Sequence, residues 1–166
     1  MRIAYMTTQL PINLFRNFAA SMYTHIIVTA PNNHIASSYE HQILRAQREN
    51  LLSRTVKVHV VHDPEGARIG SGGGTLNALY HLKCKESIDH AISTVLIVHS
   101  GGDSRRAPLQ SVMGKAWISL NSRRYERYAS PFLLLLDELN KFQSLLRPGS
   151  VVVCSSDVLL KIGEVF

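Results

Sequence analysis

The chain has 166 residues, with 18 lysines and arginines against 12 aspartates and glutamates, which gives a formal net charge of +6. This length is typical of one domain. With 45% apolar and 18% charged residues, the composition excludes a disordered polar chain, because such chains bury too little apolar surface to offset the entropy lost on folding. No apolar run in the sequence approaches the roughly 18–20 residues that cross a bilayer.

The N-terminal residues, the cysteines and the distribution of charge narrow the class of protein further. The first residues do not form a secretory signal, because Pro11, Asn13 and Arg16 interrupt any apolar core. We expect the two cysteines, Cys84 and Cys154, to be small core residues of a protein in a reducing compartment, the cytoplasm. The basic residues are scattered rather than gathered in a long tract, which argues against a nucleic-acid partner. No feature predicts a membrane partner either.

We expect residues 1–23 to be an irregular lead-in and residues 24–166 to form the folded domain. In the first half of the chain the pattern predicts a strand at 25–29, a helix from Ser37 or Ser38 to about 53 and a strand at 55–61. A glycine loop at 68–75 and a helix from 75 to about 85 follow, and then a strand at 93–99 leads into a second glycine loop at 100–106. The last predicted elements are a helix from the N-cap Ser130 and Pro131 to about 146 and a strand at 151–154. This alternation predicts an α/β fold with a mostly parallel sheet between helices. In such folds ligands bind beyond the carboxyl ends of the strands.

The first glycine segment is a candidate anion site at the start of a helix. Its residues are Gly70, Gly72, Gly73, Gly74 and Thr75. Glycines leave room for a phosphate to approach the backbone N–H groups. The segment does not match the dinucleotide fingerprint, because the threonine stands in place of the third glycine. Taken alone, it is explained slightly better as a flexible loop that ends in a Thr-capped helix.

The second glycine segment combines backbone access with cations. Its residues are Gly101, Gly102, Ser104, Arg106 and, further along the chain, Lys115. They do not form a P-loop, because Ala116 follows the lysine and the spacing between the glycines is too long. Arginine offers a planar fork and lysine a point charge, and both can offset charge on a reacting phosphate. Their occurrence together after one strand favours a polyphosphate site over a solvated turn with surface arginines.

The sequence holds candidate metal ligands at two places. Asp157 follows the last strand among small residues, where a lone carboxylate can hold Mg²⁺ together with substrate phosphates. A turn or N-cap aspartate is an equally common explanation. His59 and His62 look like a metal pair, but a spacing of three places them on opposite faces of a strand, so we do not predict a shared metal.

Three motifs together resemble the L-fucokinase/GDP-fucose pyrophosphorylase family. They are Arg68–Leu79 (RIGSGGGTLNAL), Val98–Pro108 (VHSGGDSRRAP) with Gly114-Lys115, and Cys154–Val158 (CSSDV). The resemblance covers about residues 24–162 and is to the N-terminal nucleotidyltransferase-like domain of the fucose-salvage enzymes. It implies that the α/β fold is Rossmann-like and of the nucleotidyltransferase type.

The resemblance also implies a reaction in L-fucose salvage, in which the guanylyl group of GTP passes to fucose 1-phosphate and gives GDP-fucose. Arg106 and Lys115 would then be the catalytic cations, Gly101, Gly102 and Ser104 would surround the triphosphate, and Gly70–Thr75 would lie beside the nucleotide. Asp157 would hold Mg²⁺.

The alternative is a non-catalytic, nucleotide-binding regulatory domain of an L-fucose kinase, whose C-terminal domain phosphorylates fucose with ATP. Family members continue beyond the position of Phe166. We therefore expect this chain to be a truncated domain, incomplete at its C-terminus and inactive on its own.

Overall fold

The computed structural model describes residues 23–64, 67–86, 88–89, 91–100, 114–120, 130–158 and 160. Its strands are β1 (His25–Ala30), β2 (Lys57–His62), β3 (Val95–His99) and β4 (Val151–Ser155), and its α-helices are α1 (Asn33–Arg48), α2 (Gly70–His81) and α4 (Pro131–Asn140). A π-helical turn, Leu82–Glu86, follows α2, and short 3-10 turns lie at Lys115–Trp117 and Gln143–Leu145.

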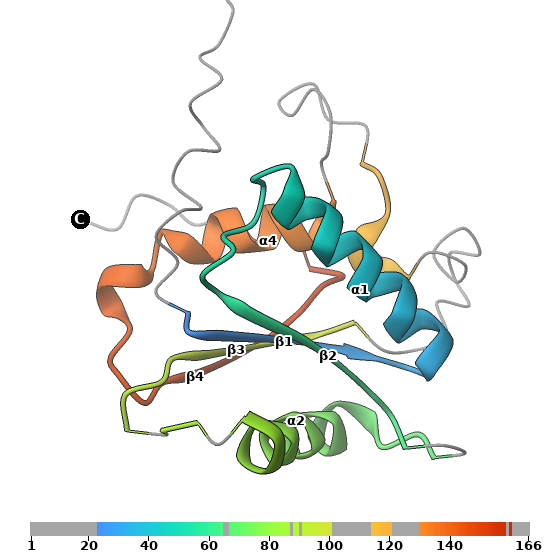
Figure 1. The fold of residues 1–166 in the computed structure, drawn as a ribbon, viewed down its shortest axis with the longest axis horizontal. Coiled ribbons are helices and arrows are strands. Elements are labelled where there is room, and N and C mark those ends of the chain that lie inside the picture. Colours follow the sequence, from blue (N-terminus) through green and yellow to red (C-terminus); the bar gives the residue numbers. More distant parts are fainter. Residues whose placement is uncertain are drawn as a thin grey trace, which may run out of the picture.

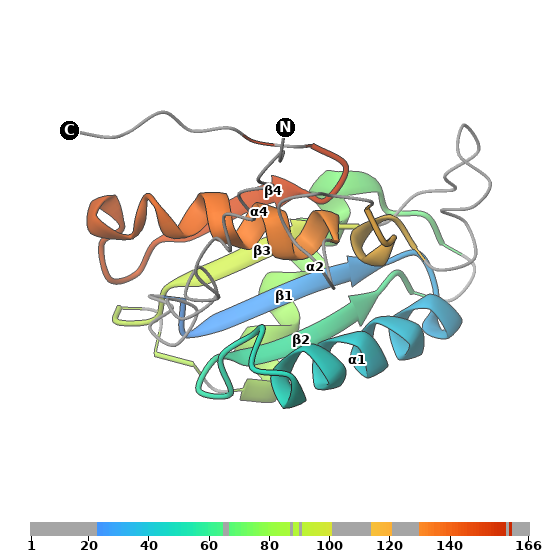
Figure 2. The same ribbon diagram turned by 90° about the horizontal axis from the view of Figure 1, so that it is seen from above.

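The four strands are parallel and form one sheet in the order β2-β1-β3-β4. α1 and α4 cover one face of the sheet, and α2 covers the other (Figure 1). Seen from above, α1 runs along the β2 side of the sheet and α4 along the β4 side (Figure 2). The predicted α/β fold, with a parallel sheet between helices, is therefore confirmed. Each predicted strand lies within two residues of its observed bounds.

The core follows from the alternation of side chains along β1. Ile26 and Val28 point into the cluster under α1 and α4, whereas Ile27 points into the cluster over α2. Every residue of β1 is buried, because the strand has a neighbour on each edge and helices on both faces. This explains the continuous apolar run in the sequence, which is typical of central strands in parallel sheets.

The start of α1 differs from the prediction. The side chain of Asn32 accepts a hydrogen bond from the N–H of Ile35 at 2.9 Å, so the helix begins at Asn33, four residues before Ser37. It also ends earlier, at Arg48, and Asn50 then adopts a left-handed φ of +57° that a continuing helix does not allow.

The predicted N-cap of α4 is confirmed. The Ser130 hydroxyl accepts a hydrogen bond from the N–H of Leu133 at 3.3 Å, and Pro131 occupies the first turn. The α-helix ends at Asn140, earlier than expected, and a 3-10 turn occupies Gln143–Leu145.

The first glycine segment is helical, which corrects its interpretation as a loop. α2 begins at Gly70, so the glycines form its opening turns and Thr75 lies inside the helix. Gly74 and Ala78 are buried against the sheet. We attribute the helical backbone to this packing, since glycine itself disfavours helix by about 1 kcal/mol per residue relative to alanine.

The prediction that both cysteines are core residues is wrong for Cys84. Cys84 is exposed rather than part of the core, because it lies in the π-helical turn after α2, whereas Cys154 is half-buried in β4.

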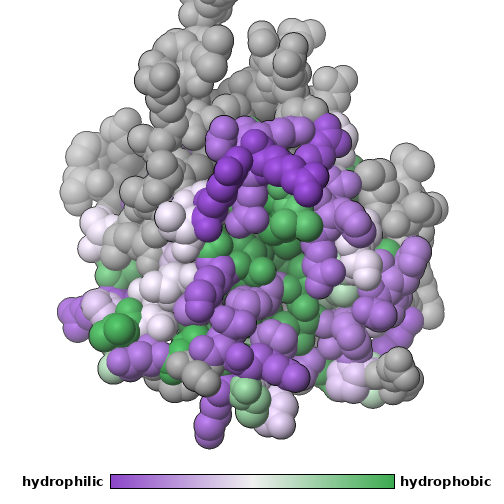
Figure 3. Space-filling view, viewed as in Figure 1, coloured by the Kyte–Doolittle hydropathy of each residue, from purple (hydrophilic) through white to green (hydrophobic). Residues whose placement is uncertain are grey.

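On the face seen in Figure 3, apolar side chains gather in the middle of the described surface and polar ones surround them. No helix in the described ranges is long and apolar enough to cross a membrane.

Candidate functional site

The strand order creates a topological switch point at the carboxyl edge of the sheet. From β1 the chain moves outward to β2, and it then crosses back to place β3 on the opposite side of β1. Connections that leave two adjacent strands in opposite directions open a space beyond their carboxyl ends, where α/β proteins bind ligands. Thr29 and His99, which are register partners near the ends of β1 and β3, mark this point.

The N-terminus of α2 lies at the same edge. No side chain caps it, since the residue before the helix is Ile69 and makes no capping hydrogen bond. The N–H groups of Gly70, Ser71 and Gly72 precede the first intrahelical bond and have no partner within the helix. A Cβ on Gly74 would lie 3.3 Å from Cε1 of His99 and 3.9 Å from Cγ2 of Thr29, so the absence of a side chain lets α2 approach the switch point closely.

His99 joins α2 to β1 through both ring nitrogens. The Thr75 hydroxyl donates to the Ser71 carbonyl at 3.0 Å and therefore accepts from Nε2 of His99, 2.9 Å away. Nδ1 of His99 then accepts from the Thr29 hydroxyl at 3.3 Å, and that hydroxyl accepts from the Ser100 N–H. Burial lowers the pKa of His99, in spite of the charge on Asp63, and so keeps the ring neutral as this arrangement requires.

Lys115 and Asp157 form an ion pair at the end of β4. Their Nζ and Oδ2 atoms are 3.3 Å apart, and the lysine side chain is 21% exposed while the aspartate is 49% exposed. The Ser155 hydroxyl donates to the other carboxylate oxygen. This hydrogen bond and then Lys115 lower the pKa of Asp157 against the opposing effect of partial burial, so the carboxylate stays ionised.

A buried tyrosine connects this pair to the end of β3. The Tyr39 hydroxyl, on α1, lies 2.8 Å from Oγ of Ser100, and the backbone N–H groups of Lys115 and Ala116 also bond to it. Gly114 has a φ of +75°, and a Cβ there would lie 2.1 Å from the tyrosine oxygen. Only glycine fits here, and the close contact fixes where the chain carries Lys115.

The end of β3 therefore connects the start of α2 with the Lys115–Asp157 pair. His99 contacts the start of α2, and its carbonyl accepts the Ser156 N–H at 2.9 Å. Ser100 contacts Tyr39, which in turn contacts the segment before Lys115. The uncapped helix start and the Lys115–Asp157 pair are thus fixed to one strand end.

The predicted site residues divide into two sets. Lys115 and Asp157 are brought together, and Gly70, Gly72, Gly73, Gly74 and Thr75 lie at the same sheet edge. Gly101, Gly102, Ser104 and Arg106 lie outside the described residues.

Sequence reasoning missed His99, Thr29 and Tyr39. The signal for His99 and Thr29 was present, because both are polar residues near the end of an otherwise apolar strand. Tyr39 gave no such signal, since an aromatic residue in a helical stripe is typical of core packing.

Asp157 also meets the requirement for a magnesium ligand. Mg²⁺ prefers carboxylate oxygen and is usually held by one or two carboxylates plus phosphates and water. The Asp157 carboxylate is ionised, half-exposed and at the carboxyl edge of the sheet. The residues present therefore fit the ion that the sequence motifs imply.

The fold is that of a parallel α/β protein, a class in which ligands bind at the switch point of the sheet. Comparison with known proteins narrows this class. The family model of the fucose pyrophosphorylase domain matches residues 90–165. No solved structure matches the chain.

Curated relatives agree with the family match. Fucose-1-phosphate guanylyltransferases of Homo sapiens and Mus musculus are each 37% identical to the chain, over 112 and 115 residues. A bifunctional fucokinase/GDP-fucose pyrophosphorylase of Arabidopsis thaliana is 31% identical over 159 residues. The alignments cover 66%, 66% and 81% of this chain, but 18%, 18% and 15% of the relatives, so the chain spans less than a fifth of their length. The family match and the relatives support the resemblance to the L-fucokinase/GDP-fucose pyrophosphorylase family that the motifs predict.

Proposed function

We propose that this chain supplies the nucleotide-binding part of a cytoplasmic transferase that passes the guanylyl group of GTP to fucose 1-phosphate. The names of the human and mouse relatives support this reaction. The observation that carries the proposal is the Lys115–Asp157 pair, a cation and a carboxylate 3.3 Å apart beside the switch point. A triphosphate with its magnesium ion requires both kinds of group.

The reaction sets the role of each charge. An oxygen of the fucose 1-phosphate attacks the α-phosphorus of GTP, the bond to the β-phosphate oxygen breaks, and GDP-fucose and pyrophosphate form. Negative charge increases on the leaving pyrophosphate, so a fixed cation there stabilises the transition state more than the ground state. Lys115 is the described candidate for this cation, and Arg106, outside the described residues, is the second.

Asp157 would hold Mg²⁺ in this site, and the ion would supply positive charge that offsets the charge of the phosphates. The lysine pairs with the same carboxylate. Lys115 is therefore placed to turn toward a phosphate once a stronger cation occupies the carboxylate. The glycine start of α2 would lie beside the nucleotide and offer its unpaired N–H groups to a phosphate.

The alternative function is a regulatory nucleotide-binding domain of an L-fucose kinase. The Arabidopsis relative favours it, since that protein is named as both a fucokinase and a pyrophosphorylase and aligns over 159 residues. In that case ATP and fucose would be the substrates of another domain, and this chain would bind a nucleotide without transferring it.

Calorimetric titration with GTP and with ATP, each in Mg²⁺, tests nucleotide binding. We expect GTP to bind weakly and Lys115→Ala or Asp157→Asn to weaken it roughly tenfold or more, the scale of one lost charged hydrogen bond. Lys141→Ala is the matched control, because Lys141 is also ion-paired, with Glu138 on α4, but lies in a different part of the fold. Absence of heat with both nucleotides, or an equal effect of Lys141→Ala, would contradict the proposal.

Measurements of enzymatic activity distinguish guanylyl transfer from the regulatory function. In a protein that carries this chain together with the further length of its relatives, Arg106→Ala, Lys115→Ala and Asp157→Asn should each lower GDP-fucose formation by about a hundredfold or more. Fucose phosphorylation should remain unchanged. A wild type that makes no GDP-fucose, with variants that alter only phosphorylation, would favour the regulatory function.

A further inference from the structure

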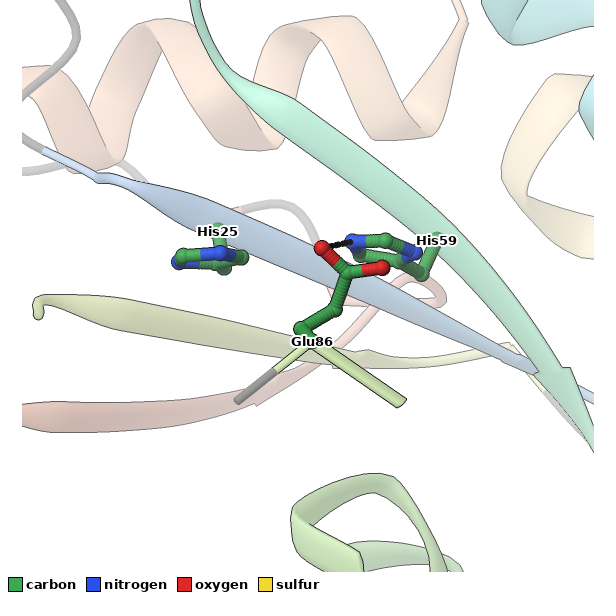
Figure 4. Close-up of side chains that lie close together, drawn as sticks. All are labelled: His25, His59 and Glu86. Atoms are coloured by element: carbon green, nitrogen blue, oxygen red, sulfur yellow. Dashed lines mark ion pairs between the residues drawn. The ribbon is translucent and has the colours of Figure 1, made fainter. Parts of the chain in front are cut away.

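A second cluster of chemically active side chains lies on the α2 face of the sheet, toward the amino ends of the strands. It consists of His25 at the start of β1, His59 in β2, and Glu86 at the end of the π-helical turn. One ligand atom from each residue lies within 4.8 Å of the other two. The two imidazole rings lie on the same side of the sheet, and the carboxylate of Glu86 points toward them (Figure 4).

This cluster is separate from the candidate nucleotide site. His25 is the first residue of β1, whereas Thr29 and His99 lie at the opposite ends of their strands. The register explains why the two histidines meet. Lys57 pairs with His25 and His59 pairs with Ile27, so alternate residues of the neighbouring parallel strands share one face.

The tautomer of His25 leaves one ring nitrogen in the cluster unprotonated and without a hydrogen-bond partner. The Thr24 hydroxyl donates to the Thr94 carbonyl at 3.0 Å, so its single hydrogen is used. Nδ1 of His25, 2.9 Å from the same oxygen, must then be the donor. The lone pair is consequently on Nε2, and this atom is buried and has no hydrogen-bond partner. Metal-binding histidines have this arrangement, in which one nitrogen donates to a neighbour and the other binds the ion.

His59 supplies a second unpaired nitrogen. Its Nε2 is buried and makes no hydrogen bond, and it lies 3.8 Å from Oε2 of Glu86. Burial lowers the pKa of both His25 and His59, so both rings are in the neutral form that binds metals. Two buried imidazole nitrogens without partners have a desolvation cost that the protein alone leaves uncompensated.

We propose that His25, His59 and Glu86 bind one divalent transition-metal ion, Zn²⁺ by the chemistry of the ligands. Two imidazoles and one carboxylate are a ligand set that zinc takes with a fourth position left to water. Tetrahedral zinc with bonds of about 2.0–2.1 Å places its ligand atoms about 3.4 Å apart. The observed 3.8 Å between Nε2 of His59 and Oε2 of Glu86 is close to this spacing, whereas the widest separation in the cluster, within 4.8 Å, requires the side chains to move together when the ion binds.

Lys57 is the group that competes with the ion. Its Nζ lies 3.3 Å from Oε2 of Glu86, and its side chain is 60% exposed. The Lys57 ammonium and a metal ion would compete for the same carboxylate, and the exposed lysine side chain can move into solvent when the ion binds. The competition gives the proposal a signature that a purely structural ion pair lacks, since removal of Lys57 should strengthen zinc binding.

Zinc titration of the 166-residue chain against a chromophoric chelator tests the site. The measurements use a Cys84→Ser background, because this exposed thiol can bind zinc by itself. We expect one ion per chain, and His25→Gln, His59→Gln or Glu86→Gln to weaken binding by more than about a hundredfold, since loss of even an outer hydrogen-bond partner costs roughly 10–100-fold. Lys57→Gln should tighten binding, and the exposed His34→Gln should leave it unchanged.

Two further measurements keep the result independent of folding. Zinc at about a hundred times its dissociation constant should raise the melting temperature of the parent chain by roughly 5–10 °C and leave that of His59→Gln unchanged. Co²⁺ should give visible bands typical of four-coordinate nitrogen and oxygen ligation, and Glu86→Gln should remove them. Binding that survives all three ligand substitutions, or that His34→Gln weakens equally, would overturn the site.

Discussion

Asp157 shows how a single hydroxyl sets the charge of a candidate ligand. Its carboxylate accepts from Ser155 two residues earlier and pairs with Lys115, and both lower its pKa. Because this pKa is lower in the folded protein than in the unfolded chain, the ionised carboxylate stabilises the fold above the unfolded pKa. The contribution is lost as the pH falls through the folded pKa.

We expect Ser155→Ala to raise the pKa of Asp157, because the Ser155 hydroxyl is the largest cause of its lowering. Lys115→Gln should also raise this pKa, because Lys115 lowers it through both a hydrogen bond and its charge. Titration of the carboxyl carbon by NMR measures both effects in the folded chain. A larger shift for Lys115→Gln than for Ser155→Ala would show that the ion pair, rather than the hydroxyl, controls the charge.

Substitution of Gly114 tests the contact that connects Tyr39 to the Lys115–Asp157 ion pair. We expect Gly114→Ala to destabilise the fold for two reasons, its φ of +75° and a Cβ only 2.1 Å from the Tyr39 oxygen. Gly70→Ala is the matched control, since Gly70 has a φ of +65° but nothing within 4 Å. Left-handed backbone costs about 1–2 kcal/mol, and overpacking adds about 1–3 kcal/mol at Gly114 alone. Urea denaturation measures both, and equal losses would contradict the close contact.

The residues of the site were predictable one at a time but not as pairs. Asp157 follows a recognisable strand, and Lys115 follows a glycine-rich stretch, so each was a candidate. Their contact depends on the position of Gly114 against Tyr39, and Tyr39 lies in a helix far from both in the sequence. His25, His59 and Glu86 meet for a similar reason, because strand register and a turn after α2 bring them together.

At the scale of elements, α2 is the main departure from the sequence prediction. Four glycines within five residues predict a loop, because glycine gains the most conformational freedom when a chain unfolds. Tertiary contacts with His99 and Thr29 reverse this preference. α1 departs for a local reason, since the side chain of Asn32 caps the helix ahead of the predicted start at Ser37 or Ser38.

The glycines of α2 can be tested by adding methyl groups. Gly72 has nothing within 4 Å of a new Cβ, so Gly72→Ala should stabilise the fold by about 0.5–1 kcal/mol through helix propensity. If a phosphate approaches this turn, the same change should weaken GTP binding. Thermal unfolding and calorimetry measure the two effects.

Gly73→Ala is the contrasting variant for this prediction. A Cβ at Gly73 would lie 2.6 Å from Cβ of Ile69, so this change should destabilise the fold. A gain in both stability and GTP affinity for Gly72→Ala would show that the glycines serve no ligand.

At the scale of the molecule, the parallel sheet was predictable but the order of its strands was not. Alternating strands and helices predict parallel pairing from sequence alone. The choice of which side of β1 receives β3 depends on packing, and it is this choice that creates the switch point. The same order leaves β2 and β4 as the edges of the described sheet.

The edge strand β4 is exposed on one face. Val151 and Val153 are 45% and 49% exposed, and they share the face of Val95 and Ile97, their register partners on β3, which belong to the cluster over α2. Apolar side chains on an unpaired edge favour pairing with another chain, because backbone hydrogen bonds and apolar burial then act together.

We therefore expect the 166-residue chain to self-associate as its concentration rises, and Val153→Lys to suppress this association. A lysine keeps its charge in water and so opposes burial of the strand edge against a second copy. Leu44→Lys is the matched control, because Leu44 is equally exposed at 49% but lies on α1, whose backbone groups are already paired within the helix. Sedimentation velocity over a range of concentrations measures the association. A chain that stays monomeric throughout, or that Leu44→Lys makes equally monomeric, would show that β4 is not the surface through which copies meet.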